Sequence, residues 1–182
     1  MRLETNSLYL RTLTVEDVGP QYVNWLNDHD VNQFLETRHS IQTIISCRKF
    51  VDETNKDKNS HLFGIFNKTN NQHIGNAKIG FINKQHGTGE ISLFIGEKSS
   101  WGKGYGKETI CCLTQYGFES LGLARIEAGI YEKNTASLQA FLSLGYSVEG
   151  FFRKKYVSQG NRCGGFWLGM LREEFKSEDL EH

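Results

Sequence analysis

The feature that most limits the fold is a change of pattern at a glycine-rich turn near the middle of the chain. Residues before the turn alternate as in a strand and those after it repeat with helical spacing, with Trp101-Gly102-Lys103-Gly104-Tyr105-Gly106-Lys107 between them. Alternate glycines let a ligand approach the backbone closely, and the N–H groups at the start of the following helix favour an anion. The turn therefore predicts a site for a phosphate or pyrophosphate, with a plain turn as the alternative.

Two named phosphate-binding motifs do not fit this turn. The dinucleotide fingerprint requires a third glycine where Lys107 stands. The P-loop requires glycine at the position of Trp101 and serine or threonine at the position of Glu108. NAD and ATP are therefore disfavoured, and a nucleotide-binding protein is kept only as an alternative.

The order of elements along the chain predicts a mixed α/β domain. Alternating apolar residues indicate strands over residues 8–13, 61–66, 74–82, 89–95, 125–131, 146–156 and 163–171. Helical spacing indicates one helix that starts near Pro20, one from the glycine turn to near Gly122, and one over residues 135–144. A further helix is expected after a cap at Ser40, with an apolar stripe of Ile41, Ile44, Ile45, Phe50 and Val51. We expect an antiparallel meander first and a crossover near the middle.

Composition narrows the class of protein. Lys+Arg 21 balances Asp+Glu 21 in 182 residues, so the main task is not expected to be binding nucleic acid or an anionic membrane. No apolar run approaches the roughly 20 residues of a membrane helix, and no secretory signal is visible, so a cytoplasmic protein is expected. The cysteines and histidines lack ligand spacing, so no metal is predicted. We expect a single domain over residues 1–179, with 180–182 as the remnant of an expression tag.

Two separated blocks resemble the GNAT acyltransferases. Gly104-Tyr105-Gly106 is similar to that family's acetyl-CoA pyrophosphate loop, Q/R-x-x-G-x-G/A, with Trp101 in place of Gln or Arg. The second block of the family has the pattern N-x-x-S…L-G-F/Y-x-x-E-G-x-x-R. This chain matches it with Asn134, Ser137, Leu144-Gly145-Tyr146, Glu149-Gly150 and Arg153. The W-G-K-G-Y form, Leu10-Arg11-Thr12-Leu13 and Trp25-Leu26-Asn27-Asp28 resemble the branch that includes ribosomal-protein alanine acetyltransferases.

This resemblance implies the GNAT acyl-CoA acyltransferase fold, a mixed and mostly antiparallel sheet flanked by helices, with acetyl-CoA as co-substrate. The strand before the glycine turn would be splayed from its neighbour, with pantetheine beside Phe94, Ile95 and Gly96, and the Ile95 N–H would stabilise the oxyanion. The pyrophosphate would lie on Gly102, Lys103, Gly104, Tyr105, Gly106 and Lys107. Asn134 and Ser137 would contact the rest of the cofactor, and they also fit a helix cap.

The resemblance also implies direct acetyl transfer to a primary amine. Glu90 occupies the place of a catalytic glutamate in histone acetyltransferases of the superfamily, with an exposed strand-end glutamate as the alternative. Leu142 stands where many relatives carry a tyrosine acid, which leaves Ser137 and Tyr146 as candidates.

The acceptor is left open between a protein N-terminal α-amine and a small-molecule amine. Residues expected to contact it are Trp25, Asp28, Phe34 and Arg38, together with the turn over residues 156–163. A non-catalytic module that binds or senses acyl-CoA is the alternative function. Neither nucleic acid nor membrane is expected as a partner, and both a monomer and a homodimer are compatible with the resemblance.

Overall fold

The computed structural model describes residues 1–158 and 160–176, and in this part of the chain one sheet holds eight strands. The strands are β1 (Arg2–Glu4), β2 (Leu8–Thr12), β3 (His61–Asn67), β4 (His73–Asn83), β5 (Thr88–Ile95), β6 (Arg125–Tyr131), β7 (Ser147–Ser158) and β8 (Asn161–Leu171). The α-helices are α1 (Pro20–Asn27), α2 (His29–Asn32), α3 (Ile44–Lys56), α4 (Tyr105–Gln115) and α5 (Thr135–Leu142). Residues expected to be an expression-tag remnant, 180–182, lie outside the described residues.

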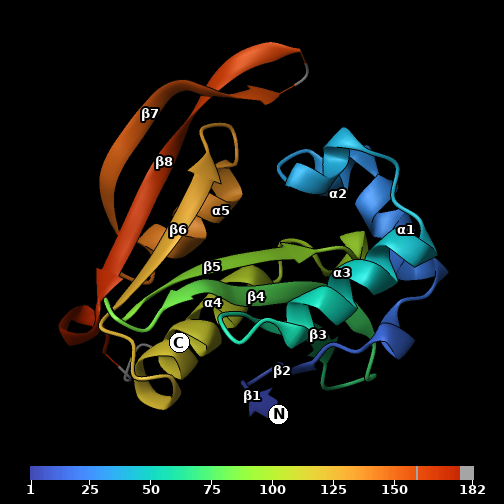
Figure 1. Ribbon diagram of the computed structural model, residues 1–182, viewed down its shortest axis with the longest axis horizontal. Helices are drawn as coiled ribbons and strands as arrows, with labels where there is room; N and C mark the ends of the chain where they lie inside the picture. Colours follow the sequence, from blue (N-terminus) through green and yellow to red (C-terminus); the bar gives the residue numbers. More distant parts are fainter. Residues whose placement is uncertain (159, 177–182) are drawn as a thin grey trace.

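The sheet is mixed and mostly antiparallel, as the sequence predicted. Its strand order is β1-β2-β3-β4-β5-β6-β8-β7, and only β5 and β6 run parallel. Parallel neighbours need a crossover connection, and α4 supplies it. In Figure 1 the strands β6, β7 and β8 diverge from β1–β5 like the arms of a V.

Helices cover both faces of the sheet. On one face Leu113 of α4 and Phe141 of α5 pack in a core with Ile79 and Ile126 of the sheet. On the other face α1 and α3 bury a smaller cluster that includes Leu26 and Val51. Helix α4 thus packs on β5 from one face, while α3 packs on β3 from the other (Figure 1).

The structure corrects the expected helix after Ser40. The helix α3 begins at Ile44, because Thr43 caps it by accepting from the Ser46 N–H at 3.1 Å. Ile41 therefore precedes the helix and is 87% exposed, and Ile45 is 81% exposed. Of the expected apolar stripe only Val51 is buried, and it is joined by Cys47, which lies four residues earlier on the same face; the other four residues are exposed.

Strand β1 was not predicted from the sequence. It pairs with β2 through three residues, from Arg2 opposite Arg11 to Glu4 opposite Tyr9. A strand of three residues offers too few positions for an alternating pattern to stand out.

None of the helices within residues 1–158 and 160–176 is long and apolar enough to cross a membrane. Over the same residues, His, Cys, Asp and Glu side chains form no group of three or more that could hold a metal ion. The cytoplasmic location stays a prediction.

Candidate active site

The strands β5 and β6 pair only at one end. Their register joins Thr88 with Arg125, Gly89 with Ile126 and Glu90 with Glu127, and it stops there. Beyond Glu90, β5 continues to Ile95 paired with β4 alone. The two parallel strands therefore separate in the middle of the sheet and leave one edge of β5 open.

The backbone of β5 offers hydrogen-bonding groups to this opening. The Gly96 N–H donates to the Ile74 carbonyl of β4 at 2.8 Å, and residues along a strand alternate in the side to which their N–H groups point. Leu93 and Ile95 therefore turn their N–H groups away from β4 and toward the gap. The Ile95 carbonyl accepts from Trp101 Nε1 at 2.8 Å, which ties the glycine turn to the open strand.

The glycine turn has the backbone that an anion cradle requires. Gly102 and Gly104 have φ angles of +74° and +79°, which side-chain-bearing residues rarely adopt. A Cβ at Gly102, Gly104 or Gly106 would meet no atom within 4 Å, so the space above the turn is free for a ligand. Gly104 is the residue before α4, so the first N–H groups of an eleven-residue helix point toward this space.

A cleft of about 750 Å³ extends from this turn along the open strand. On the α4 and α5 side its walls include Gly102, Gly104, Tyr105, Gly106, Lys107, Asn134 and Ser137, and along β5 they include Phe94 and Ile95. The Asn134 side chain accepts from the Ser137 N–H at 3.2 Å and so caps α5, while both residues line the cleft. We call this the cofactor cleft, after the acetyl-CoA that the sequence resemblance implies. Lys103 is exposed in the turn and does not line it.

A second cleft of about 530 Å³ lies on the other face of the sheet, and we call it the acceptor cleft. Half-buried Glu90 lines it, with Lys78 of β4 also on its wall. Burial raises the pKa of the Glu90 carboxyl above its usual range, the Lys78 ammonium opposes this change, and Glu127 adds to it. A carboxylate with a raised pKa is suited to accept a proton near neutral pH.

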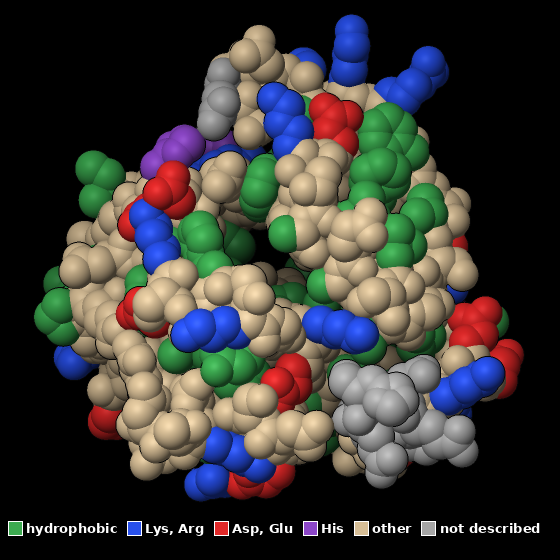
Figure 2. Space-filling model, turned by 180° about the vertical axis from the view of Figure 1, so that it is seen from behind, with side chains coloured by type: hydrophobic (Ala, Val, Ile, Leu, Met, Phe, Trp, Pro, Cys, Tyr) green, Lys and Arg blue, Asp and Glu red, His purple; other side chains and the backbone are tan. Residues whose placement is uncertain are grey.

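The two clefts meet at the gap between β5 and β6. Residues that line both are Phe34, Leu35, Ser92, Leu93, Phe94, Gly129, Ile130 and Tyr131. Figure 2 shows a deep hollow at the centre of the face seen from behind, with hydrophobic side chains around it and basic side chains near its rim. A donor in one cleft and an acceptor in the other could thus react through the opening in the sheet.

Tyr131 at the end of β6 was not singled out from the sequence. Its hydroxyl donates to Glu36 and accepts from Arg38 Nη2 at 2.7 Å. Burial raises the pKa of Tyr131 to about 12; Glu36 adds to the increase and Arg38 opposes it. Tyr131 and Glu36 come from elements 95 residues apart, so no local pattern could reveal this contact.

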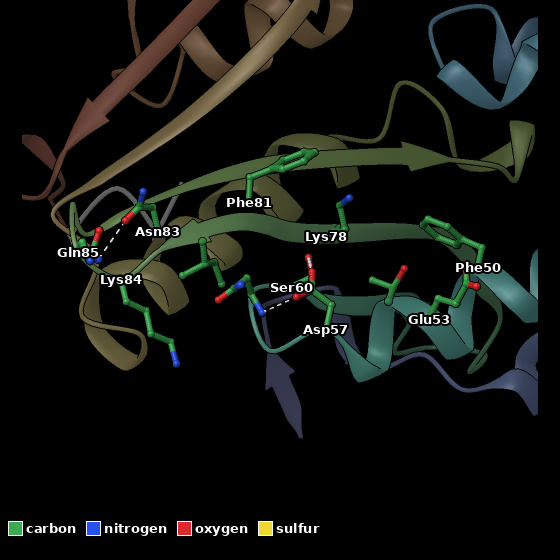
Figure 3. Close-up of a pocket in the computed structure, with 12 residues that line it drawn as sticks. Phe50, Glu53, Asp57, Ser60, Lys78, Phe81, Asn83, Lys84 and Gln85 are labelled. Carbon is green, nitrogen blue, oxygen red and sulfur yellow. Dashed lines mark hydrogen bonds between the residues drawn. The ribbon is translucent and has the colours of Figure 1, made fainter.

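The acceptor cleft continues into an open groove of about 770 Å³ between β4 and α3. Phe50, Lys78 and Phe81 line both the cleft and this groove, and Figure 3 shows them with Glu53 and Asp57 along it. Phe81 has a φ of +50° at a bulge of β4, and its ring is 72% exposed. No sequence pattern predicted this groove, because the bulge that turns Phe81 outward depends on strand pairing.

Several expected site residues lie elsewhere. Tyr146 is 3% exposed, its hydroxyl is bonded to the Thr114 hydroxyl at 2.7 Å, and it lines neither cleft. This placement in the core disfavours its expected role as a proton donor. Gly96 is also outside the cofactor cleft, because its N–H turns to β4 and the Trp25 indole covers its Cα.

Of the four residues expected to contact the acceptor, two lie at the clefts or contact a residue that lines them, and two lie elsewhere. Phe34 lines both clefts, and Arg38 holds Tyr131. Trp25 instead packs against Gly96 and Phe94 as part of the core, and Asp28 caps α2 and pairs with Lys98 at 2.8 Å. Both side chains are used in packing and capping and line neither cleft, which disfavours the contacts with the acceptor that were expected of them.

Comparisons with known proteins agree with this geometry. A family model described as an acetyltransferase (GNAT) domain matches residues 7–147. The N-acetyltransferase p20 of Bacillus licheniformis is 28% identical over 181 residues, which cover 95% of this chain and 97% of that protein. The N-acetyltransferase YoaA of Bacillus subtilis is 30% identical over 159 residues, which cover 87% of this chain and 89% of that protein.

A solved structure shows the same fold at lower identity. The spermidine N-acetyltransferase of Vibrio cholerae, in complex with CoA and spermine, superposes with a TM-score of 0.83 at 19% identity, covering 92% of this chain and 97% of that one. The family match over most of the chain and the named relatives identify an acyltransferase enzyme rather than a sensing module. The chain belongs to the GNAT family of acetyltransferases.

Proposed function

We propose that this protein transfers the acetyl group of acetyl-CoA directly to a primary amine. The observation that carries the proposal is the junction of two clefts at the open edge of β5. One cleft has an anion cradle at its end, and the other holds a half-buried carboxylate. This arrangement fits a donor with a pyrophosphate at one end and a reactive thioester at the other.

The residues present fit acetyl-CoA. The free space above Gly102, Gly104 and Gly106 would hold the pyrophosphate, with Lys107 adding positive charge. The pantetheine amides would pair with the open N–H and carbonyl groups of β5 in the manner of an added strand. Ser137 and Asn134 would contact the donor from α5.

Within this site Glu90 would accept the proton of the attacking amine, directly or through a water molecule. The thioester oxygen gains negative charge as the amine adds, and the Ile95 N–H would donate to it. The amine must be neutral to attack the thioester, so its ammonium form has to lose a proton. A carboxylate with a raised pKa, such as that of Glu90, is a stronger base for this step than an ordinary glutamate.

The acceptor is a protein N-terminal α-amine or a small-molecule amine. The groove beyond the acceptor cleft, with its exposed Phe81 ring, supports an acceptor whose body extends past the amine. Spermidine acetylation by the structural relative supports a small polyamine instead. The resemblance to ribosomal-protein alanine acetyltransferases favours a protein N-terminus.

Release of the CoA thiol tests the proposal. The protein is incubated with acetyl-CoA and, in separate reactions, short peptides with a free N-terminus and linear polyamines. We expect thiol release to require an amine. One molecule of acetylated product, identified by mass spectrometry, should form for each thiol released. Absence of amine-dependent release with both acceptor classes, at concentrations that saturate a peptide or polyamine site, would contradict acetyl transfer to an amine.

A further inference from the structure

One step of the proposed reaction has no assigned residue, namely protonation of the sulfur that leaves. Leu142 offers no proton at the position where many relatives carry tyrosine, and Tyr146 lies in the core. The acetyl group passes from the cofactor cleft to an amine in the acceptor cleft. The sulfur must therefore lie where the two clefts meet, and its proton donor must line both.

Among the residues that the structure describes, two side chains that line both clefts carry a hydroxyl group, Ser92 and Tyr131. The others at this junction are apolar side chains or glycine. A phenol is a stronger acid than an aliphatic hydroxyl, because tyrosine titrates even where burial raises its pKa, as it does for Tyr131, whereas serine does not titrate in proteins. Tyr131 is therefore the stronger proton donor of the two.

The position of Tyr131 across the gap supports this choice. Continuing the register of β5 and β6 past Glu90 and Glu127 places Tyr131 level with Phe94, one residue from Ile95. The Ile95 N–H faces the gap from the opposite wall and is the expected partner of the thioester oxygen. A thioester held there has its sulfur between the two walls.

The hydroxyl of Tyr131 is held by groups that fit proton transfer. It donates to Glu36 and accepts from Arg38, which also donates to the Val157 carbonyl at 2.9 Å. The Glu36 side chain is 73% exposed and so can exchange protons with water. The Arg38 guanidinium lies next to the oxygen, where it stabilises the phenolate formed when the proton leaves.

We propose that Tyr131 is the catalytic acid that protonates the CoA sulfur, an inference that rests on the proposed function. As the C–S bond breaks, its electron pair goes to sulfur, which takes the proton from Tyr131 Oη. The proton lost by the amine goes to Glu90 and then to water, while Tyr131 regains one from water through Glu36. The sum is an acetylated amine and a neutral thiol, with no other reactant.

The test measures the pKa of the thiol of bound CoA. The ultraviolet absorbance of the thiolate is recorded as the pH is raised. Tyr131→Phe removes the donor, so the thiol pKa should rise by about one unit or more. Tyr116→Phe is the matched control, because it removes another buried hydroxyl, bonded to His61 at 3.2 Å, that lines neither cleft. It should leave the thiol pKa unchanged.

Turnover is measured on the same variants with the best acceptor found. Tyr131→Phe should reduce kcat roughly 10²- to 10³-fold and leave the dissociation constant of CoA within about twofold at a pH where the thiol is protonated. An unchanged thiol pKa in Tyr131→Phe, or a rise caused by Ser92→Ala instead, would overturn the proposal. A parent protein that binds no CoA would contradict the proposed function itself. A parent that binds CoA but shows no effect of Tyr131→Phe would contradict only the assignment of Tyr131.

A second variant covers the case in which Tyr131→Phe does not fold. Glu36→Gln alters an exposed side chain and keeps the tyrosine. Loss of the carboxylate that competes for the hydroxyl proton strengthens the bond from Tyr131 to the thiolate, so the thiol pKa should fall. A thiol pKa equal to that of the parent would overturn the assignment.

Discussion

Glu90 of β5 and Glu127 of β6 face each other as the last pair before the two strands separate. Past this pair the sheet opens, the backbone of β5 loses its second neighbour, and two clefts meet. The carboxylate that lines the acceptor cleft is thus held by paired strands on one side and borders the opening on the other. Rigid support beside an open edge is what a catalytic base needs.

Glu90→Gln should abolish most turnover while leaving CoA binding intact. The amide has the shape of the carboxyl group but cannot accept the amine proton, so we expect kcat to fall roughly 10²-fold or more. Glu127→Gln is the matched control, since Glu127 lies opposite in the register but lines neither cleft; because Glu127 also raises the pKa of Glu90, the variants are compared at a pH above the acid limb. Steady-state rates and a CoA titration are measured on both, and equal kcat values for Glu90→Gln and the parent would contradict the assignment.

The pH profile should carry the signature of Glu90. Because burial raises its pKa, the acid limb of kcat should lie above the usual range of a glutamate, with rates rising as the carboxyl loses its proton. Lys78 lowers this pKa, so Lys78→Met should move the acid limb to higher pH. Lys84→Met, a change in the groove but outside the acceptor cleft, should leave the limb in place. A limb that does not move with Lys78→Met would show that another group titrates.

Tyr146→Phe should lower stability without changing turnover. The variant loses one buried hydrogen bond to Thr114, whose hydroxyl keeps its bond to the Ile110 carbonyl at 2.8 Å. We expect the free energy of unfolding to fall by about 1 kcal/mol in a urea titration. A large loss of kcat in a fully folded variant would return Tyr146 to the list of catalytic residues.

Phe81→Gly tests whether the acceptor extends into the groove. Glycine accepts the φ of +50° and removes the exposed ring, so stability should change by less than about 1 kcal/mol. If a peptide acceptor packs on this ring, its KM should rise roughly tenfold while that of a compact amine stays the same. Equal KM values for parent and variant with peptides of increasing length would exclude the groove from acceptor binding.

The Asp17 carboxylate should stabilise the N-terminal region at neutral pH. Burial favours a higher pKa for Asp17, but hydrogen bonds from Arg11 Nη1 and the Thr14 N–H, both 2.8 Å long, lower the pKa to about 2. A carboxyl whose pKa is lower in the folded state stabilises the fold at pH values above its unfolded pKa. This stabilisation is lost as the pH falls through the folded pKa. Because the pair is partly exposed, Asp17→Asn should cost about 1–2 kcal/mol near neutral pH and almost nothing at the acid end of this window.

The control for this effect is Asp52→Asn, whose partner Lys56 lies 2.6 Å away on the exposed face of α3. An exposed pair of this kind contributes less than about 1 kcal/mol. Urea titrations of both variants and the parent are compared at neutral and acid pH. A pH-independent loss in Asp17→Asn would mean that packing, rather than charge, holds this residue.

The parts of the site that the sequence predicted are those built from neighbouring residues. The glycine turn, the cap from Asn134 to Ser137 and the strand that ends at Ile95 each depend on a few consecutive positions. Local backbone preferences specify such features, so a single sequence reveals them. Glu90 could be singled out because the family resemblance places a catalytic glutamate near the start of the strand that leads to the turn.

The parts that were missed depend on which face of an element meets which partner. Tyr146 and Trp25 are polar-tipped aromatic residues that the family pattern places near a site, yet both are buried in packing. Tyr131 becomes part of the site only when β6 packs beside the turn that carries Glu36 and Arg38. Contacts between distant segments follow from tertiary packing, which a single sequence does not encode in any local pattern.

Calorimetric titration of acetyl-CoA into the purified protein tests whether the glycine turn and the cofactor cleft bind this donor. Gly104→Asp places a carboxylate where the pyrophosphate would lie, and Gly160→Asp is its control, with a φ of +75° and no atom within 4 Å of an added Cβ. We expect acetyl-CoA to bind the parent and Gly160→Asp, and not to bind Gly104→Asp. Equal binding by all three, or no binding by the parent, would contradict the assignment of this turn and cleft to acetyl-CoA.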